Sequence, residues 1–253
     1  MTNIILVGCN GKMGRVITSL VEFDRDCKIV AGVDVSDAIE NCYPVFTDAN
    51  LCDADADVII DFSHPSALSG SIALARKKKI PLIEATTGLS EEQKKELFEA
   101  QSEIPVFFSA NMSLGINLLT ALCKKATALL WDDFDVEIIE KHHNQKIDAP
   151  SGTALALADG ISEVLSNKPE YVYDRHSVRK KRTKNEIGIH AIRGGTIVGE
   201  HSVIFAGKDE VIELKHQATS KEVFAVGSIR AAKFMKGKPA GLYDMNCLIG
   251  EMI

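Results

Sequence analysis

The sequence lacks the features that mark several large classes of protein. Its six cysteines include no CxxC pair and none of the short spacings of a small secreted disulfide domain, so we expect free thiols in a reducing compartment. No apolar stretch nears the roughly 20 residues needed to cross a bilayer, and the start MTNIILVGCNG has no signal-peptide pattern. These absences predict a cytoplasmic protein with no membrane partner.

Positive charge is scarce relative to negative charge. The net charge is −6 at pH 7, whereas nucleic acid or an anionic membrane as the main partner would demand a clustered basic surface. The basic runs at 76–79 and 179–184 are therefore interpreted as solvated helix and loop faces. A length of 253 residues, with 45% hydrophobic content, allows one large globular domain or two smaller ones.

The first 110 residues alternate short apolar runs with helical patterns. Strands are expected at 4–7, 28–34, 57–62, 81–85 and 105–108, and helices at 12–22, after His64-Pro65 and behind the N-cap Ser90. Such alternation predicts a parallel sheet with helices on both faces, in the α/β class.

After Asn111 the pattern changes. An apolar helix is expected over about 114–130, and a second helix behind Ser151 would place Leu157, Ala158, Ile161, Val164 and Leu165 on one face. Residues 187–217 alternate with period two between Gly-rich turns, which predicts an antiparallel or mixed sheet. The last segment is helical again, so we expect the chain to return to the first domain.

A glycine pattern follows the first expected strand and opens the first expected helix. In GCNGKMG, Gly8, Gly11 and Gly14 would let backbone amides approach a pyrophosphate at the positive helix N-terminus. The spacing is GxxGxxG, not the commoner GxGxxG, so a plain tight turn is the alternative. Asp34 favours dinucleotide binding, because a carboxylate ending the second strand commonly accepts hydrogen bonds from the adenosine ribose. Its simpler interpretation is a surface acid.

Asp34 also bears on the choice between the two nicotinamide cofactors. Its charge would repel a 2'-phosphate, and Val35, Ser36 and Asp37 follow where a neighbouring arginine would be needed. We therefore expect NADH to be used at least as well as NADPH.

The segment from Glu140 to Ala154, EKHHNQKIDAPSGTA, concentrates polar and ionisable groups just before an amphipathic helix. The amides near Gly152 and Thr153 are unpaired at a helix start, and the hydroxyls of Ser151 and Thr153 lie beside them. Such a helix start is a natural site for a carboxylate. Ser151 as an N-cap alone is the simpler interpretation.

Positive charge and a proton donor accompany this carboxylate site. His143 and Lys146 would attract a dianion, and His142 or Lys146 could donate a proton, because histidine titrates near neutrality and burial lowers the pKa of lysine. Two histidines can also bind a metal, but no suitably spaced Cys, Asp or Glu completes a ligand set, so no metal is expected. Lys146 alone could be a solvated loop residue, but so many coinciding features favour a functional site.

Several blocks of this chain resemble the 4-hydroxy-tetrahydrodipicolinate reductases, also called dihydrodipicolinate reductases, of bacterial lysine and diaminopimelate synthesis. The resemblance covers essentially the whole chain and is most specific at HHxxKxDAPSGTA. The matching blocks are VGCNGKMGR (7–15), IDFSHP (60–65), ATTGL (85–89), FSANMSLGIN (108–117), IIEKHHNQKIDAPSGTA (138–154), IVGEH (197–201) and GLYDM (241–245).

The resemblance implies a Rossmann-like dinucleotide-binding domain over residues 1–110 and 221–253. It also implies an α+β domain with a mixed sheet over residues 111–220, which binds substrate and builds a homotetramer. The implied reaction removes water from a cyclic hydroxy-imine dicarboxylate and delivers hydride from NADH or NADPH to the conjugated ring, giving tetrahydrodipicolinate.

Site residues are implied by the same matching. His142 resembles the family's catalytic histidine and Lys146 its proton-donating lysine, while His143, Gly152 and Thr153 resemble its carboxylate binders. The implied cofactor contacts are Gly8, Cys9, Asn10, Gly11, Lys12 and Met13 at the pyrophosphate, Asp34 at the ribose, and Ala85, Thr86, Thr87, Ser109, Ala110, Asn111 and Met112 at the nicotinamide.

Two rival functions account for less of the sequence than the reductase does. Another two-domain reductase, such as an amino-acid or sugar dehydrogenase, would share the cofactor half but gives no reason for HHxxK followed by SGT. A nucleotide-binding sensor with the same fold and no turnover would be expected to have lost His142, Lys146 or Thr153, and all three are present. The reductase is therefore favoured.

Overall fold

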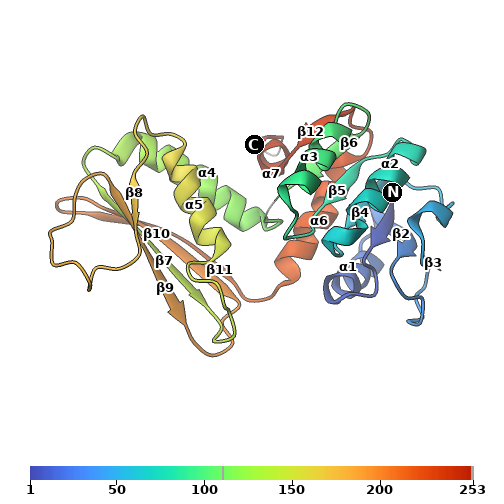
Figure 1. Ribbon diagram of the computed structural model, residues 1–253, viewed down its shortest axis with the longest axis horizontal. Helices are drawn as coiled ribbons and strands as arrows, with labels where there is room; N and C mark the ends of the chain where they lie inside the picture. Colours follow the sequence, from blue (N-terminus) through green and yellow to red (C-terminus); the bar gives the residue numbers. More distant parts are fainter. Residues whose placement is uncertain (110, 252–253) are drawn as a thin grey trace. The chain divides into compact units, whose positions relative to one another are not determined.

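The computed structural model describes residues 1–109 and 111–251, which divide into two compact units (Figure 1). Unit 1 comprises Met1–Leu114 and Glu222–Ile253, and unit 2 comprises Gly115–Lys221. In the described part of the chain, no helix is long and apolar enough to cross a membrane.

Unit 1 is built on a parallel sheet with strand order β12-β6-β5-β4-β1-β2-β3. Its strands are β1 (Thr2–Val7), β2 (Cys27–Val33), β3 (Val45–Phe46), β4 (Val58–Asp61), β5 (Leu82–Glu84), β6 (Pro105–Phe108) and β12 (Gly241–Tyr243). Its helices are α1 (Lys12–Glu22), α2 (Leu68–Lys78), α3 (Glu91–Ala100), α6 (Glu222–Met235) and α7 (Met245–Gly250), with short 3-10 turns η1 (Ala49–Leu51) and η2 (Pro65–Ala67). The predicted Rossmann-like parallel sheet is confirmed.

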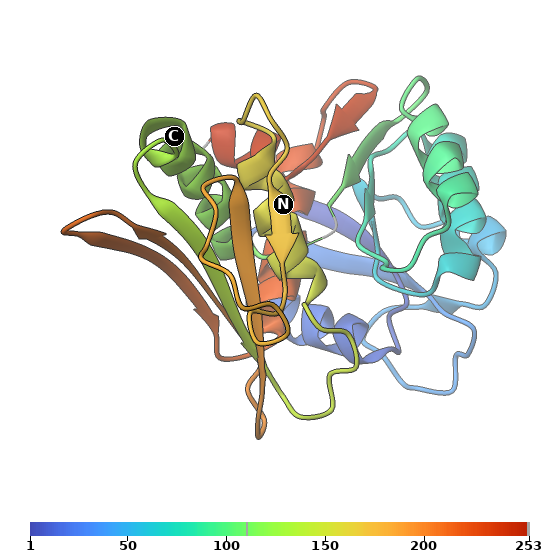
Figure 2. The same cartoon turned by 60° about the vertical axis from the view of Figure 1, so that its left-hand side comes forward.

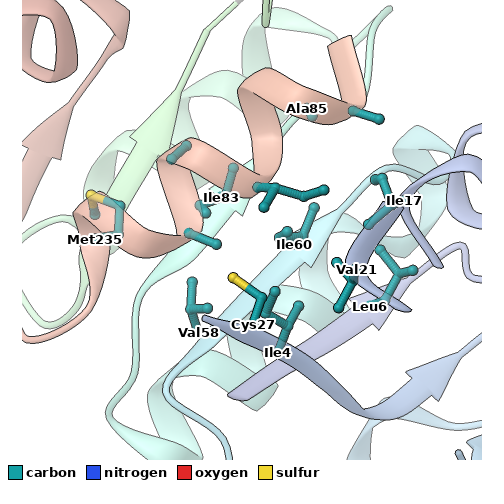
Figure 3. Close-up of a cluster of buried hydrophobic side chains, with 14 of the residues drawn as sticks. Ile4, Leu6, Ile17, Val21, Cys27, Val58, Ile60, Ile83, Ala85 and Met235 are labelled. Carbon is teal, nitrogen blue, oxygen red and sulfur yellow. The ribbon is translucent and has the colours of Figure 1, made fainter. Parts of the chain in front are cut away.

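Side chains of the sheet contribute to a hydrophobic core on each face, because successive residues of a strand point to opposite sides. Ile4 and Leu6 of β1 lie in a cluster with Met235 of α6 and with α1, and Figure 3 shows Leu6 next to Val21 and near Ile17 of α1. The intervening residues of β1 lie in a second cluster with residues of α2 and α3. Helices therefore cover both faces of the sheet, as predicted.

Unit 2 is built on a mixed sheet with strand order β11-β10-β7-β9-β8. Its strands are β7 (Asp135–His142), β8 (Glu170–Val172), β9 (Glu186–Arg193), β10 (Gly199–Ala206) and β11 (Val211–Ala218), and its helices are α4 (Leu114–Leu130) and α5 (Gly152–Ser162). β7 pairs in parallel with β9 and antiparallel with β10, and β10 and β11 form the hairpin drawn in dark orange in Figure 2. Both helices pack on one face of this sheet, through Leu119 of α4 and Leu157 and Ile161 of α5.

The predicted apolar face of α5 is wrong at its C-terminal end. Leu157 and Ile161 are fully buried, but the helix ends at Ser162 and Val164 is 42% exposed. The sequence SNKP follows, and serine, asparagine and proline favour turns over a helix interior. We attribute the end of α5 at Ser162, before the last residues of its apolar pattern, to the low helix propensity of this region.

The interpretation of the run 179–184 as a solvated face is wrong for one residue. The Arg182 side chain is only 17% exposed, and its guanidinium bonds the Asp135 carboxylate at 2.9 Å and the Glu137 carboxylate at 3.0 Å. It also donates to the carbonyl oxygens of Val136 and Glu186. Arg182 thus holds the loop before β9 against the first residues of β7 and β9.

Candidate functional site

The glycine turn after β1 borders a cleft of about 820 Å³ in unit 1. Gly8 has φ +81°, a conformation open to glycine, and a Cβ there would lie 2.7 Å from the carbonyl oxygen of Phe62. A Cβ at Gly14 would lie 2.1 Å from the carbonyl oxygen of Gly8. The turn therefore presents bare backbone to the cleft just before the first amides of α1.

Most of the residues predicted to contact the pyrophosphate or the ribose of the cofactor line this cleft. Those that line it are Gly8, Asn10, Gly11, Lys12, Met13 and Asp34. The Asn10 amide donates to the Asp34 carboxylate at 2.9 Å, which fixes the acid at the end of β2. Cys9 differs, because its thiol is fully buried and burial, with the charge of Asp34, raises its pKa to about 11. Cys9 does not line the cleft.

Residues beyond the predicted set also line this cleft. They are Thr47, Asp48, Ala49, Phe62, Ser63, His64, Ser66, Ala67, Gly70 and Ser71, with Val7, Val33 and Val35. The segment IDFSHP could have been recognised from the sequence, because it includes the end of an expected strand, and the carboxyl ends of parallel strands meet at the same sheet edge as the glycine turn. The part contributed by η1 and the start of α2 had no comparable motif.

The residues predicted for the nicotinamide follow β5 and β6 at that same edge, but none of them lines this cleft. Thr86 is buried and Thr87 is exposed, while Ser109 donates to the carbonyl oxygen of Asn111 at 2.9 Å. The Met112 side chain is 3% exposed and packs in the core. Ala85 is buried as well, and Ala110 lies outside the described residues.

In unit 2, Glu140 is the centre of a buried polar network. Glu140 and His142 lie two residues apart on β7, so both point to the helix-covered face, and their side chains meet at 2.6 Å through His142 Nδ1. Arg193, which pairs with His142 in the β7–β9 register, donates to both Glu140 oxygens, at 2.8 and 2.7 Å. The carboxylate is fully buried. Such a two-pronged contact fixes both its position and its charge.

The charge state of Glu140 follows from these contacts. Burial alone would raise its pKa, but hydrogen bonds from Arg193, His142 and the Ser151 amide outweigh burial and hold the pKa below its usual value. An ionised Glu140 can only accept, so His142 Nδ1 carries the proton of their hydrogen bond. Nε2 is then the ring atom left for a ligand, and a Cβ at Gly199 would lie 3.1 Å from it. Glycine keeps that space open.

Ser151 connects this network to the start of α5. Its hydroxyl accepts from the Ala154 amide at 3.1 Å, which caps the helix, and lies 3.1 Å from His201 Nε2. Burial, and then the charge of His142, lower the pKa of His201 to about 4. His201 is therefore neutral at pH 7, with its ring edge-on to His142 at a centroid distance of 5.2 Å.

Lys146 and the first amide of α5, that of Gly152, already hold a carboxylate of the chain itself. Lys146 Nζ lies 2.9 Å from the Asp148 carboxylate, and the lysine side chain is 22% exposed. The hydrogen bond from Lys146 lowers the pKa of Asp148, and the Gly152 amide acts in the same direction. Gly152 is exposed and Thr153 half-buried. In the structure, the anion held at this position is the Asp148 carboxylate of the same segment.

The structure therefore places the predicted residues in two adjoining parts of one segment. His142 and Ser151 belong to the buried network, while Lys146 and Gly152 surround Asp148 and His143 is half-buried between them in sequence. Among residues 1–109 and 111–251, no group of three or more His, Cys, Asp or Glu side chains could hold a metal ion.

Three supporting residues of this site were missed as site residues. Glu140 had a signal, because it lies two positions before His142 on an expected strand and must share its face. Arg193 and His201 lie on β9 and β10, and their approach to Glu140 and Ser151 depends on strand register. Periodicity alone does not give that register.

Comparison with known proteins covers the whole chain. The family model described as dihydrodipicolinate reductase, N-terminus, matches residues 2–112, and its C-terminus counterpart matches residues 115–249. A 4-hydroxy-tetrahydrodipicolinate reductase of Clostridium tetani is 54% identical over 99% of this chain and 98% of its own length. One of Caldanaerobacter subterraneus is 53% identical over 98% of both chains.

A solved structure supports the fold. The dipicolinate-bound dihydrodipicolinate reductase from Paenisporosarcina sp. TG-14 superposes with a TM-score of 0.81 and 24% identity, covering 97% of this chain and 99% of that chain. A dehydrogenase from Chromobacterium violaceum, solved with NADH, has a TM-score of 0.61 and 12% identity, covering 99% and 90%.

Proposed function

The chain belongs to the dihydrodipicolinate reductase family, and we propose that it reduces 4-hydroxy-tetrahydrodipicolinate to tetrahydrodipicolinate with loss of water, using NADH or NADPH. The observation that carries the proposal is the network of Glu140, Arg193 and His142 beside an anion site at the start of α5. This network fixes the imidazole of His142 close to the site at the start of α5 where a substrate carboxylate would bind. The reaction belongs to the diaminopimelate route to lysine.

The cleft of unit 1 fits a dinucleotide. A Cβ at Gly8 would collide with Phe62 and Ser63, and one at Gly14 with the carbonyl groups of Gly8 and Cys9, so glycine lets the turn pack tightly at the start of α1. Unpaired amides at such a helix start favour a pyrophosphate. Asp34 is held by the Asn10 amide through one oxygen, which leaves the other for ribose hydroxyls. When bound, the nicotinamide supplies the hydride for the reduction. The predicted nicotinamide contacts at the ends of β5 and β6 complete this proposal.

The start of α5 is proposed to hold a substrate carboxylate. The Gly152 and Thr153 amides and the positive end of the helix favour an anion, and Lys146 already contacts one there. His143 and the Ser151 segment complete the proposed set. This part of the chain would orient the ring and one of its acidic groups.

His142 and Lys146 are proposed to handle charge and protons. Conjugate hydride addition builds negative charge on the substrate ring, so a cation and a proton donor nearby lower the barrier. Glu140 holds the His142 ring by Nδ1 and leaves Nε2 facing the ligand, and Nε2 can donate only when both ring nitrogens are protonated. Lys146 offers an ammonium group on the next loop.

A coupled assay tests the proposed reaction. The upstream synthase, fed pyruvate and aspartate semialdehyde, generates the substrate, and nicotinamide oxidation is followed on adding this protein. Absence of turnover with both cofactors would end the reductase proposal. Tight NADH binding without turnover would instead support the nucleotide sensor.

Cofactor preference gives a first specific prediction. Because Asp34 faces the ribose position and Val35 and Ser36 follow it on an exposed turn, we expect kcat/KM with NADH to equal or exceed that with NADPH. Asp34→Ala is expected to narrow the difference, since it removes the charge that opposes a 2'-phosphate. A strong NADPH preference of the unaltered protein would contradict this assignment.

Inhibition gives a second prediction. Pyridine-2,6-dicarboxylate is a planar mimic of the ring and of both carboxylates, so it is expected to compete with substrate at the start of α5. Steady-state kinetics should show a raised apparent KM at constant kcat. Inhibition that excess substrate does not relieve would place the inhibitor elsewhere.

We also propose that the protein is a homotetramer assembled through the sheet of unit 2. The face of that sheet away from α4 and α5 carries partly exposed apolar side chains such as Ile192, which is 45% exposed. Sedimentation equilibrium measures the mass directly, and a monomer at micromolar concentration would refute the proposal.

A further inference from the structure

Two buried carboxyl groups lie side by side in unit 1, apart from the groups that the proposed reaction uses. Asp61 is the last residue of β4 and Glu84 the last of β5, and the two are paired in the parallel register. Paired residues of neighbouring strands point to the same face of a sheet. Asp61 is 1% exposed and Glu84 is 0% exposed.

Hydrogen bonds are distributed unequally over this pair. The Asp61 carboxyl contacts the Ser63 amide at 3.1 Å, the Ser63 hydroxyl, the Ser71 hydroxyl at 2.5 Å and the Thr86 hydroxyl at 3.3 Å. Glu84 Oε1 accepts from the Thr86 amide at 2.8 Å. Its other oxygen, Oε2, is buried and has no hydrogen-bond partner among the described residues.

Two adjacent negative charges would be costly in this position. Burial, and then the charge of Asp61, raise the pKa of Glu84 to about 8. Burial also raises the pKa of Asp61, although its hydrogen bonds act in the opposite direction. With donors around Asp61 and an unpartnered oxygen on Glu84, the charge belongs on Asp61 and the proton on Glu84.

The groups around the pair connect it to the cofactor cleft. Thr86 touches both carboxyls, Oγ1 with Asp61 and the amide with Glu84, and its Oγ1 accepts from the Ser63 amide at 3.2 Å. Ser63 and Ser71 line the cleft, and the Ser63 Cβ would lie 2.8 Å from a Cβ at Gly8. The pair thus supports the wall behind the glycine turn.

We propose that Asp61 and Glu84 together hold a single proton, which Glu84 carries, and that this proton positions Ser63 and Thr86 for cofactor binding. The positioning role rests on the proposed dinucleotide site. Loss of the proton places a second charge beside Asp61, and the two carboxylates then repel each other and disturb the Thr86 bridge that touches both.

Among the described residues around the pair, Asp61 of β4 is the one group that titrates beside Glu84. The other neighbours do not titrate: Ser71 comes from α2, Ser63 from the turn after β4, Thr86 from the turn after β5 and Phe108 from β6. His64 is exposed, and its Nδ1 lies 2.9 Å from the Ser66 hydroxyl. A pH effect near 8 is therefore assigned to Glu84 itself.

Infrared spectroscopy and cofactor titration test the two halves of the proposal. At pH 7 the unaltered protein should show the C=O stretch of a protonated carboxylic acid, which disappears with a midpoint near 8. Glu84→Gln should lack this band, and Asp61→Asn should move its loss to lower pH, since the neighbouring charge is gone. The exposed Glu22→Gln is the matched control and should keep the band.

NADH affinity, measured by fluorescence, supplies the second readout. The Kd of the unaltered protein and of Glu22→Gln should rise up to about tenfold between pH 8 and 9, the limit for loss of one proton. Glu84→Gln stays neutral, so its Kd should change by less than about twofold over that range.

Each outcome bears on a different part of the proposal. No protonated carboxyl at pH 7, or an unchanged band in Glu84→Gln, would overturn the shared proton. A titrating band with a pH-independent Kd, or equal pH dependence in Glu84→Gln, would overturn the positioning role. Failure of the unaltered protein to bind NADH at any pH would overturn the cofactor site and with it the positioning role, whereas the band would still report the proton.

Discussion

Replacing Lys146 by alanine is expected to lower kcat by about 100-fold or more, as loss of a general acid usually does. Hydride addition leaves negative charge on the substrate ring, and the Lys146 ammonium contacts the Asp148 carboxylate at 2.9 Å, just before the start of α5. Its side chain is 22% exposed, so it can reach a ligand while remaining held by the loop. Steady-state kinetics with saturating cofactor measure the effect.

The split between kcat and KM decides the role of this lysine. A raised KM with unchanged kcat would assign Lys146 to carboxylate binding and refute its role as proton donor. Lys208→Ala is the matched control, because Lys208 is an exposed lysine of the same unit in the β10–β11 turn. His142→Gln, measured in parallel, shows which of the two proposed donors contributes more.

Replacing Arg193 by methionine is expected to reduce the free energy of unfolding by about 3–5 kcal/mol, the usual result of removing one partner of a buried ion pair. Glu140 is fully buried, and Arg193 supplies two of its hydrogen bonds. The remaining carboxylate would keep only His142 and the Ser151 amide. Chemical denaturation measures the change, and kcat should fall as well because His142 loses its fixed orientation.

A double variant separates charge burial from other effects of the substitution. Arg193→Met combined with Glu140→Gln removes both charges, so much of the stability lost in the single variant should return. Arg179→Met, at an exposed position in the same unit, should unfold like the unaltered protein. A loss below about 1 kcal/mol in the single variant would show that the ion pair is weak.

The order of elements in unit 1 could be predicted because its signals are local. The apolar run before Gly8 and the helical pattern behind it define β1 and α1, and Ser90 forms the capping box that opens α3. Short edge elements gave no comparable signal. β3 has two residues and β12 three, too few for a hydrophobic period to appear.

The site was predictable only as far as chain proximity reaches. His142, Lys146 and Ser151 share one segment, so their proximity follows from sequence alone. Arg193 lies 53 positions from Glu140 in the sequence, on another strand. A shift of one residue in the register of that strand would turn the Arg193 side chain to the other face of the sheet. The Asp61–Glu84 pair was not predicted either, because neither acid is unusual within its own strand and only the strand register brings the two together.

Under the proposed function, a substrate carboxylate at the start of α5 has to take the place of the Asp148 carboxylate. The Asp148 carboxylate already engages Lys146 and the start of α5, so a ligand carboxylate that binds there replaces one anion by another. The local charge then changes little on binding, and the free energy gained is the difference between two similar pairings. Affinity at this position would therefore respond weakly to ionic strength, and selectivity would come from the shape of the ring more than from the charge of its acid groups.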